Sequence, residues 1–293
     1  MLRIKTFGNR NPLSGLSQIE GGFVSLGHVI VDDNPDIIYH ANGYFDDLLE
    51  YARNYPNATK IGCLLDADPL NPNWGPPEIV EDQLLQLDIP VTISYTAQQQ
   101  ILKRTNVKCA VVYYPIKRVE CLDYPVRGVR MLVVGRIYSK NKRLQLIKDV
   151  AEKYCGDYEQ VLFVGPEKPP FGIYAGLATE EMLNVYYNSS VFLLALSSTE
   201  GLYLPMLESA VAKTIPILTL DNSCVREFGL QKFAADPNPK DIVDKMNHIE
   251  RHFKEYSREI TLLGVGFKER FSGKAVAKNI LALYHDHKKD KNL

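Results

Sequence analysis

The stretch Glu200-Gly-Leu-Tyr-Leu-Pro-Met-Leu-Glu208 places two carboxylates at the ends of a short segment that contains a glycine and a proline. The apolar run 191–196 before it is too short for a helix and is followed by small polar residues, which predicts a buried strand of a parallel sheet. Pro205 suits the first turn of a helix, because the N–H that proline lacks would have no helical partner there. We therefore expect Glu200 at the carboxyl end of a strand and Glu208 near the start of the next helix.

A strand, turn and helix of this kind form a common anion site. Open parallel sheets bind ligands beyond the carboxyl ends of their strands, where helix N-termini offer unpaired N–H groups to phosphate. A diphosphate fits between the two glutamates, and each carboxylate can accept charge-assisted hydrogen bonds from vicinal hydroxyls. The spacing thus favours a nucleotide-sugar site over the alternative, two solvated glutamates around a loop.

Other segments in the second half of the chain follow a recognisable order. They are Val134-Gly-Arg136 with Lys142, the strand and glycine at 161–165, the stretch 176–194 with its acidic helix start, and Leu207-Glu-Ser-Ala-Val-Ala-Lys-Thr-Ile-Pro216. Together they resemble the nucleotide-binding half of retaining GT-B glycosyltransferases of family 4, the sucrose synthase-like and mannosyltransferase-like enzymes. The resemblance is carried by residues 130–240 and is weaker before residue 115.

The resemblance implies an α/β protein with the GT-B architecture, in which two Rossmann-like parallel-sheet domains face a central cleft. Alternating strand and helix patterns in the first half fit a second parallel sheet. We expect an unusually short acceptor-side domain at 1–120 and a nucleotide-sugar-binding domain at 128–272. We expect a final helix, 273–293, to pack back on the first domain.

Site roles follow from the same resemblance. Breaking the bond to a nucleoside diphosphate adds negative charge to the leaving phosphate, which fixed cations stabilise. Arg136 and Lys142 match the cations of the family, Glu200 its sugar-binding carboxylate, and Glu208 its ribose-binding carboxylate. With cations in that role, the resemblance implies no metal and no cofactor beyond the donor substrate, a UDP-, GDP- or ADP-sugar. The other expected donor-binding positions are Gly201, Leu202, Tyr203, Leu204, Gly15, Gly135, Lys140, Gly165 and Tyr174.

Three positions depart from the family pattern. Tyr203 stands where a second glycine is usual, and Leu202 stands where an aromatic residue is usual, so the approach of the backbone to the donor phosphate is altered. Leu65 stands where many members place a donor-contacting histidine. Lys142 lies six residues after Arg136 and Lys140 four, whereas five is usual, so either lysine fits.

Acceptor-side groups are expected in the first half of the chain. Asp66 and Asp68 follow an apolar strand at 60–65, and His40 follows another at 37–39. On the acceptor side these groups can orient a hydroxyl. An alternative is that Asp66 and Asp68 hold Mg²⁺ or Mn²⁺, as in metal-dependent GT-A glycosyltransferases.

We therefore predict an enzyme, a hexosyltransferase that moves a hexose from a nucleoside diphosphate sugar to an acceptor with retention. The acceptor, a glycan, lipid or protein, is left open. A catalytically weak nucleotide-sugar-binding protein is the alternative. A nicotinamide oxidoreductase is disfavoured because no Gly-x-Gly-x-x-Gly follows a strand.

Composition limits the partners. The 293 residues carry 34 basic and 35 acidic side chains, so the net charge of −1 predicts no attraction to nucleic acid and leaves room only for weak peripheral membrane association. The five scattered cysteines predict reduced thiols and a cytoplasmic protein. The start of the chain is too quickly polar for a signal peptide.

Overall fold

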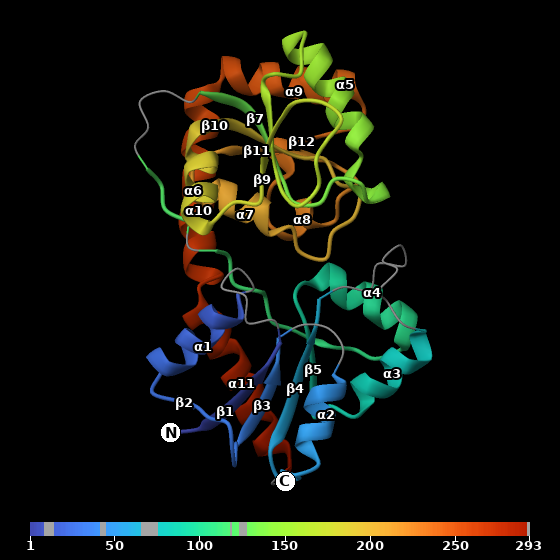
Figure 1. Ribbon diagram of the computed structural model, residues 1–293, viewed down its shortest axis with the longest axis vertical. Coiled ribbons are helices and arrows are strands. Elements are labelled where there is room, and N and C mark those ends of the chain that lie inside the picture. Colours follow the sequence, from blue (N-terminus) through green and yellow to red (C-terminus); the bar gives the residue numbers. More distant parts are fainter. Residues whose placement is uncertain (9–14, 42–44, 66–75, 118, 123–127, 292–293) are drawn as a thin grey trace. The chain divides into compact units, whose positions relative to one another are not determined.

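Two parallel β-sheets organise the chain in the computed structural model, each in its own compact unit (Figure 1). The structure describes residues 1–8, 15–41, 45–65, 76–117, 119–122 and 128–291. Unit 1 combines residues 1–116 with 269–293, and unit 2 spans 117–268.

The sheet of unit 1 has the order β2-β1-β3-β4-β5-β6, and all its pairs are parallel. Its strands are β1 (Arg3–Phe7), β2 (Val29–Ile30), β3 (Ile37–His40), β4 (Thr59–Leu64), β5 (Ile89–Thr92) and β6 (Ala110–Val111). Its helices are α1 (Leu16–Ser25), α2 (Asp46–Ala52), α3 (Pro77–Leu85), α4 (Tyr95–Thr105) and α11 (Gly273–Lys291).

Close helix packing and a buried apolar cluster hold unit 1 together. Helix α1 packs along α11, and a Cβ on Gly22 would lie 2.3 Å from the carbonyl oxygen of Gly273, so the two backbones touch. The strands bury nearly continuous apolar runs, as expected for a parallel sheet with helices against it. One buried cluster gathers Ile38, Phe45, Leu48, Leu64, Leu84 and Ile101 from β3, α2, β4, α3 and α4 and the residue before α2.

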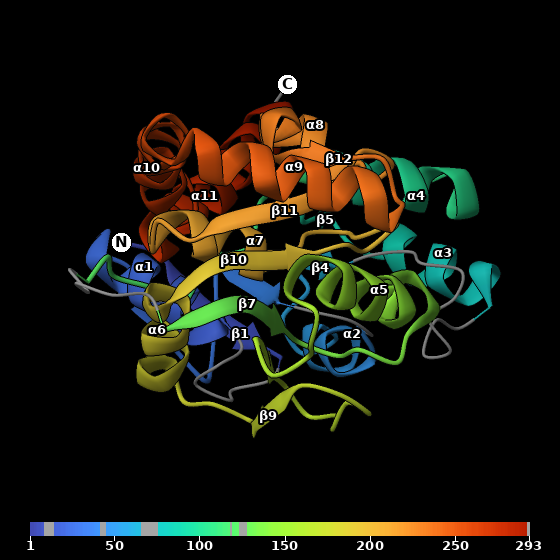
Figure 2. The same cartoon turned by 90° about the horizontal axis from the view of Figure 1, so that it is seen from above.

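The sheet of unit 2 has the order β12-β11-β10-β7-β8-β9, again all parallel, and Figure 2 shows β10 between β7 and β11. Its strands are β7 (Val129–Val134), β8 (Val161–Val164), β9 (Ile173–Gly176), β10 (Ser190–Ala195), β11 (Ile215–Thr219) and β12 (Ala234–Ala235). Its helices are α5 (Leu144–Cys155), α6 (Glu180–Ser189), α7 (Leu204–Val211), α8 (Cys224–Glu227) and α9 (Pro239–Arg251), with α10 (Phe253–Arg270) running to its end and the 3₁₀ turns η2 (Lys140–Lys142) and η3 (Gln231–Phe233).

The order of strands fixes where ligands bind in such sheets. In unit 2 the chain builds outward from β7 to β9 and then returns to add β10 on the other side of β7. The loops that leave β7 and β10 therefore diverge, and a crevice opens beyond the carboxyl ends of these strands. The corresponding point in unit 1 lies between β1 and β3.

The α/β fold with two parallel sheets is confirmed. Strands β9 and β12 were not predicted, because β12 has only two residues and β9 carries a glycine and sits at the sheet edge, where little is buried. Among the described residues, none of the helices combines the length and apolarity that crossing a membrane requires.

Candidate functional site

A lysine and a glutamate meet at the point where the strand order of unit 2 reverses. Lys142 ends the 3₁₀ turn after β7, and Glu200 lies in the loop after β10. The Lys142 Nζ lies 2.5 Å from Glu200 Oε1, and the two side chains are only 17% and 13% exposed. Burial lowers the local dielectric and strengthens this attraction, while the remaining exposure leaves the pair accessible to a ligand.

Hydrogen bonds to backbone carbonyls hold the two loops in register. The side-chain amide of Asn141 donates to the carbonyl of Thr199 at 3.0 Å, and the backbone N–H of Ser198 donates to the carbonyl of Asn141 at 2.9 Å. The thiol of Cys224, at the start of α8, donates to the carbonyl of Glu200 at 3.4 Å. The residues on either side of the ion pair are therefore fixed by bonds independent of the two charges.

Tyr203 lies beneath the ion pair. Its ring is buried, its hydroxyl donates to the carbonyl of Val134 at 2.8 Å, and its ring centroid lies 4.5 Å from Lys142 Nζ. Burial raises the pKa of the Tyr203 hydroxyl, so it stays neutral. Tyr203 thus directs its side chain into the unit, where it joins the end of β7 to the loop after β10.

Glu208 occupies a different environment from Glu200. It lies in α7 and is 1% exposed, and its two carboxylate oxygens accept from the N–H of Lys117 at 3.1 Å and from the hydroxyl of Tyr187 at 2.8 Å. Burial raises the pKa of this carboxyl above its ordinary value, although both bonds and the nearby Lys117 oppose the rise. Binding of a ribose by Glu208 stays a prediction, and it requires that the residues covering this 1% exposed side chain move aside.

Gly135 and Gly165 bring the ends of β7 and β8 together. Gly135 has a φ of +110°, and a Cβ on Gly165 would lie 2.2 Å from the carbonyl oxygen of Gly135. The hydroxyl of Tyr174, in β9, donates to the carbonyl of Gly165 at 3.1 Å. These three predicted donor-binding residues therefore form one tightly packed corner at the ends of β7 and β8.

The remaining predicted donor-binding residues of unit 2 line the same loops. Arg136 and Lys140 are exposed, Gly201 is buried, and Leu202 and Leu204 are half-buried. Arg136 lies two residues after the end of β7, and its charge adds to the backbone bonds from Ile137 and Tyr138 that lower the pKa of Glu167. Arg136 and Lys140 are thus accessible cations on the loop that carries Lys142.

Gly15 and His40 lie at the corresponding point of unit 1. Gly15 precedes α1 with a φ of +72°, and a Cβ there would lie 2.5 Å from a ring carbon of Tyr114. His40, at the end of β3, is 4% exposed and its Nε2 lies 3.2 Å from Asp47 Oδ1. Burial lowers its pKa, which favours the neutral ring. Asp66 and Asp68 lie outside the described residues.

Sequence reasoning missed two side chains that shape these loops. Arg143 precedes α5 with a φ of +53°, and its guanidinium binds the hydroxyl of Thr219, at the end of β11, and the carboxylate of Asp221 after it. The carboxylate of Glu167 accepts from the N–H groups of Ile137, at 2.7 Å, and Tyr138, at 3.1 Å, and these bonds lower its pKa. The run 140–143, which carries three cations after a predicted strand, could have pointed to Arg143 as a residue of these loops.

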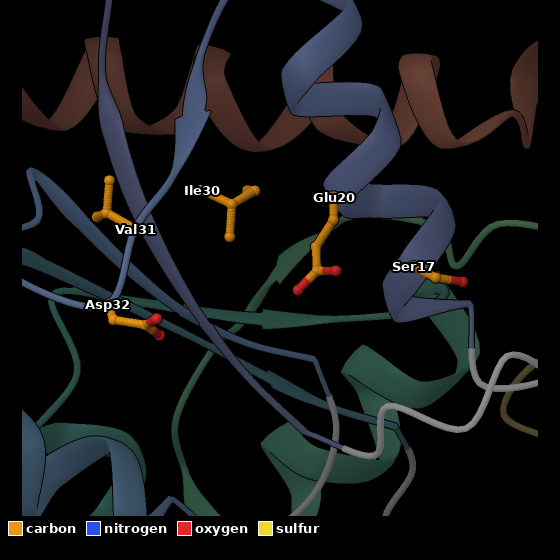
Figure 3. A pocket seen from close by; sticks show the side chains of 5 residues that line it. All are labelled: Ser17, Glu20, Ile30, Val31 and Asp32. Atoms are coloured by element: carbon orange, nitrogen blue, oxygen red, sulfur yellow. The ribbon is translucent and has the colours of Figure 1, made fainter.

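A polar hollow of about 320 Å³ in unit 1 was also missed (Figure 3). Ser17 and Glu20 reach it from α1, and Ile30, Val31 and Asp32 come from β2 and the residues after it. Thr6 donates to Glu20 at 2.5 Å and Lys5 to Asp32 at 2.7 Å. Because each carboxylate has more acceptor sites than one bond uses, the hollow can accept hydrogen bonds from hydroxyl groups.

The two sheets and their strand orders define a GT-B-like fold, and solved structures agree over nearly the full chain. Sucrose-phosphate synthase from Thermosynechococcus elongatus has a TM-score of 0.73 at 10% identity, covering 98% of this chain and 99% of that one. HepE from Anabaena, in complex with UDP-glucose, gives 0.69 at 11% identity, covering 98% and 100%. A glycosyltransferase from Rickettsia africae gives 0.69 at 14% identity, covering 98% and 99%.

These likenesses establish the fold. No protein-family model matches the sequence, and a search of curated proteins finds no match. The GT-A alternative is wrong, because the chain forms two separate parallel sheets. Among the described residues, no group of three or more His, Cys, Asp or Glu side chains is arranged to hold a metal ion.

Proposed function

We propose that this chain is a hexosyltransferase that takes its sugar from a nucleoside diphosphate sugar, with retention and without a metal ion. The observation that carries the proposal is the Lys142–Glu200 ion pair at the strand-order reversal of unit 2. A cation and a carboxylate side by side match the two halves of the donor, a diphosphate and a sugar with vicinal hydroxyls. Acceptor recognition belongs to unit 1 in this proposal, and the hollow around Glu20 fits an acceptor rich in hydroxyls.

In this proposal, Lys142 leaves Glu200 for the β-phosphate when the donor binds. Arg136, exposed on the same loop, adds a second positive charge to the leaving diphosphate. Glu200, released from Lys142, accepts hydrogen bonds from the hydroxyls of the transferred hexose. The departing phosphate can take the proton of the acceptor hydroxyl, so the transfer needs no side-chain base.

A uridine nucleotide is the first donor to test, because HepE, which shares the fold, is solved with UDP-glucose. A thermal-shift panel of UDP, GDP, ADP and their glucose conjugates, with and without EDTA, tests the proposal. One nucleoside diphosphate should raise Tm by several degrees regardless of EDTA, since ligand at about 100 times its Kd adds about 2.7 kcal/mol. Failure of all three nucleotides to shift Tm would refute the proposal.

A matched pair of variants tests whether the diphosphate of the donor binds at Lys142. Lys142→Met removes the charge and keeps the length of the side chain, and it should weaken diphosphate binding about tenfold or more, the worth of a charge-assisted hydrogen bond. Lys153→Met, on the exposed side of α5, is the control and should bind as the wild type does. Equal affinities for the two variants would exclude Lys142 from the site.

A nucleotide-sugar-binding protein with little turnover is the second candidate, favoured by Tyr203 in the position of a usual glycine and by the bond that fixes it to Val134. Release of nucleoside diphosphate from the donor separates the two. Slow release of nucleoside diphosphate, with water or an added compound as the acceptor of the sugar, indicates an enzyme. Tight binding of the donor without this release indicates a binding protein.

A further inference from the structure

Arg143 occupies a backbone conformation that is costly for an arginine. It lies between Lys142 and the start of α5 with a φ of +53° and a ψ of +48°, in the left-handed region. Glycine adopts this region without penalty, whereas a side chain with a Cβ crowds the backbone there. Such strain persists only when the surrounding contacts hold it in place. The contacts of the Arg143 side chain therefore indicate what the residue does.

The Arg143 guanidinium is held by the residues that end β11 and follow it, 219–224, which we name the β11 turn. Nη1 donates to Asp221 Oδ1 at 3.0 Å and to the Thr219 hydroxyl at 3.2 Å, and Nη2 donates to Asp221 Oδ2. Two parallel bonds to one carboxylate are the arrangement that the planar guanidinium favours and a lysine does not reproduce. The bonds from Arg143 lower the pKa of Asp221, so its carboxylate stays charged near neutral pH.

The β11 turn also holds the loop that carries Glu200. The Thr219 hydroxyl donates to the carbonyl of Ser197 at 3.2 Å, and the side-chain amide of Asn222 donates to the same carbonyl at 2.9 Å. The backbone N–H of Cys224 donates to Asn222 Oδ1 at 3.0 Å, and its thiol donates to the carbonyl of Glu200. The β11 turn is therefore a common base for the loops on both sides of the ion pair.

Both chain neighbours of Lys142 are thus anchored to other loops. Asn141 is bonded to the loop after β10, and Arg143 is bonded to the β11 turn. The ammonium of Lys142 can leave Glu200 for a phosphate while its backbone stays in place. This matters for catalysis, because a cation that is already positioned stabilises a developing charge without reorganisation.

The anchoring distinguishes the two lysines of the 3₁₀ turn η2. Lys142 lies six residues after Arg136 and Lys140 four, so the spacing alone does not choose between them. Lys140 lies outside the anchored stretch 141–143 and is exposed, whereas the Lys142 side chain is 17% exposed. Of these two lysines, Lys142 is the one whose position the surrounding loops fix.

We propose that Arg143 and Asp221 are positioning residues of the donor site, whose ion pair fixes Lys142 for the diphosphate of a nucleoside diphosphate sugar. In this role neither side chain touches the donor, and both act through Lys142. The inference rests on the proposed function, since it requires a diphosphate at Lys142. It also explains the arginine at a left-handed position, because a glycine there would keep the turn and provide no anchor.

A double-mutant cycle on donor affinity tests this role, with whichever of UDP, GDP and ADP binds the wild type as the probe. Asp221→Asn removes the charge of the anchor and should weaken binding about fivefold in calorimetry, the worth of a partly exposed ion pair. In the Lys142→Met background the same change should alter affinity by less than about twofold, because no ammonium is left to position. Asp244→Asn, which opens an exposed ion pair with Lys240 on α9, is the control and should bind as the wild type does.

Two changes at Arg143 separate positioning from direct contact with the donor. Arg143→Gly keeps the left-handed turn and should weaken binding as Asp221→Asn does. The exchange Arg143→Asp/Asp221→Arg rebuilds the ion pair with its charges reversed, and aspartate tolerates the left-handed region. If the pair positions Lys142, the exchanged variant should bind the nucleotide more tightly than Asp221→Asn, although position 143 is then acidic.

Three results would overturn the proposal. One is tighter binding by Asp221→Asn, which would show that Asp221 competes with the donor for Arg143. Another is the same loss of affinity from Asp221→Asn with and without the Lys142 ammonium, which would show general damage to the loops. The third is an exchanged variant that keeps the wild-type Tm and binds no better than Asp221→Asn. All three leave nucleotide binding by the wild type intact, whereas failure of the wild type to bind any of the nucleotides would refute the proposed function and the positioning role together.

Discussion

Lys142 and Glu200, 58 positions apart in the sequence, form an ion pair of 2.5 Å between the loops that leave the two central strands of unit 2. A donor that binds here must compete with this pair. A diphosphate offers Lys142 more negative charge than one carboxylate does. When Lys142 moves from Glu200 to the diphosphate, Glu200 is free to accept hydrogen bonds from sugar hydroxyls. Recognition of the diphosphate and of the sugar should therefore be coupled.

The first prediction concerns Glu200→Gln. Without the negative charge, only a neutral amide oxygen competes for Lys142, so the free nucleoside diphosphate should bind about fivefold more tightly, or by about 1 kcal/mol. The sugar conjugate should gain less, because glutamine is a weaker acceptor for the hexose hydroxyls. Isothermal titration calorimetry of both ligands measures this change in preference.

Glu255→Gln, an exposed change on α10, serves as the control and should leave both affinities unchanged. Weaker binding of the free diphosphate by Glu200→Gln would contradict the coupling.

The second prediction separates the two contacts of Tyr203. Tyr203→Phe keeps the ring beneath Lys142 but leaves the carbonyl of Val134 without this donor, so the free energy of unfolding should fall by about 1–2 kcal/mol with little change in donor affinity. Tyr203→Leu also removes the ring beneath the ammonium, so donor affinity should change as well. Urea unfolding and calorimetry distinguish the two effects, and identical donor affinities in both variants would show that the ring does not position Lys142.

The third prediction uses two adjacent glycines of α1. Gly22→Ala places a Cβ 2.3 Å from the carbonyl oxygen of Gly273, so α1 and α11 must separate at a cost of about 1–3 kcal/mol. Gly21→Ala meets nothing within 4 Å and should stabilise the helix by up to about 1 kcal/mol. Changes of opposite sign in urea unfolding are expected, and the same sign for both would argue against close contact of the two helices.

The fourth prediction is a pH dependence from Glu208. Burial raises the pKa of its carboxyl in the folded state, so its stabilising contribution is present below the unfolded pKa and is lost as pH rises through the folded value. Glu208→Gln resembles the protonated form. The Tm of the variant relative to wild type should therefore increase as the pH rises above about 4.5, the ordinary pKa of this carboxyl. The exposed control Glu255→Gln should show no such trend, and a difference that shrinks with rising pH would contradict the assignment.

Many elements could be predicted from local patterns, and the exceptions have physical causes. The apolar runs that became β4, β7, β8, β10 and β11 are strongly patterned because both faces of a central parallel strand are buried. The edge strand β12 is two alanines, too short to leave a pattern. His40 was placed correctly at the end of a strand, but its contact with Asp47 and its burial depend on packing that local patterns do not encode.

The sequence alone determined the class of fold, because alternating buried strands and amphipathic helices leave few topologies other than parallel sheets with right-handed connections. It also indicated which loops carry charge, through Arg136, Lys142 and Glu200 after predicted strands. Only the tertiary structure decided what these charges meet. The partnership of Lys142 with Glu200 and Tyr203, and the enclosure of Glu208 by Tyr187 and Lys117, join segments distant in sequence, whose spacing depends on sheet order and burial.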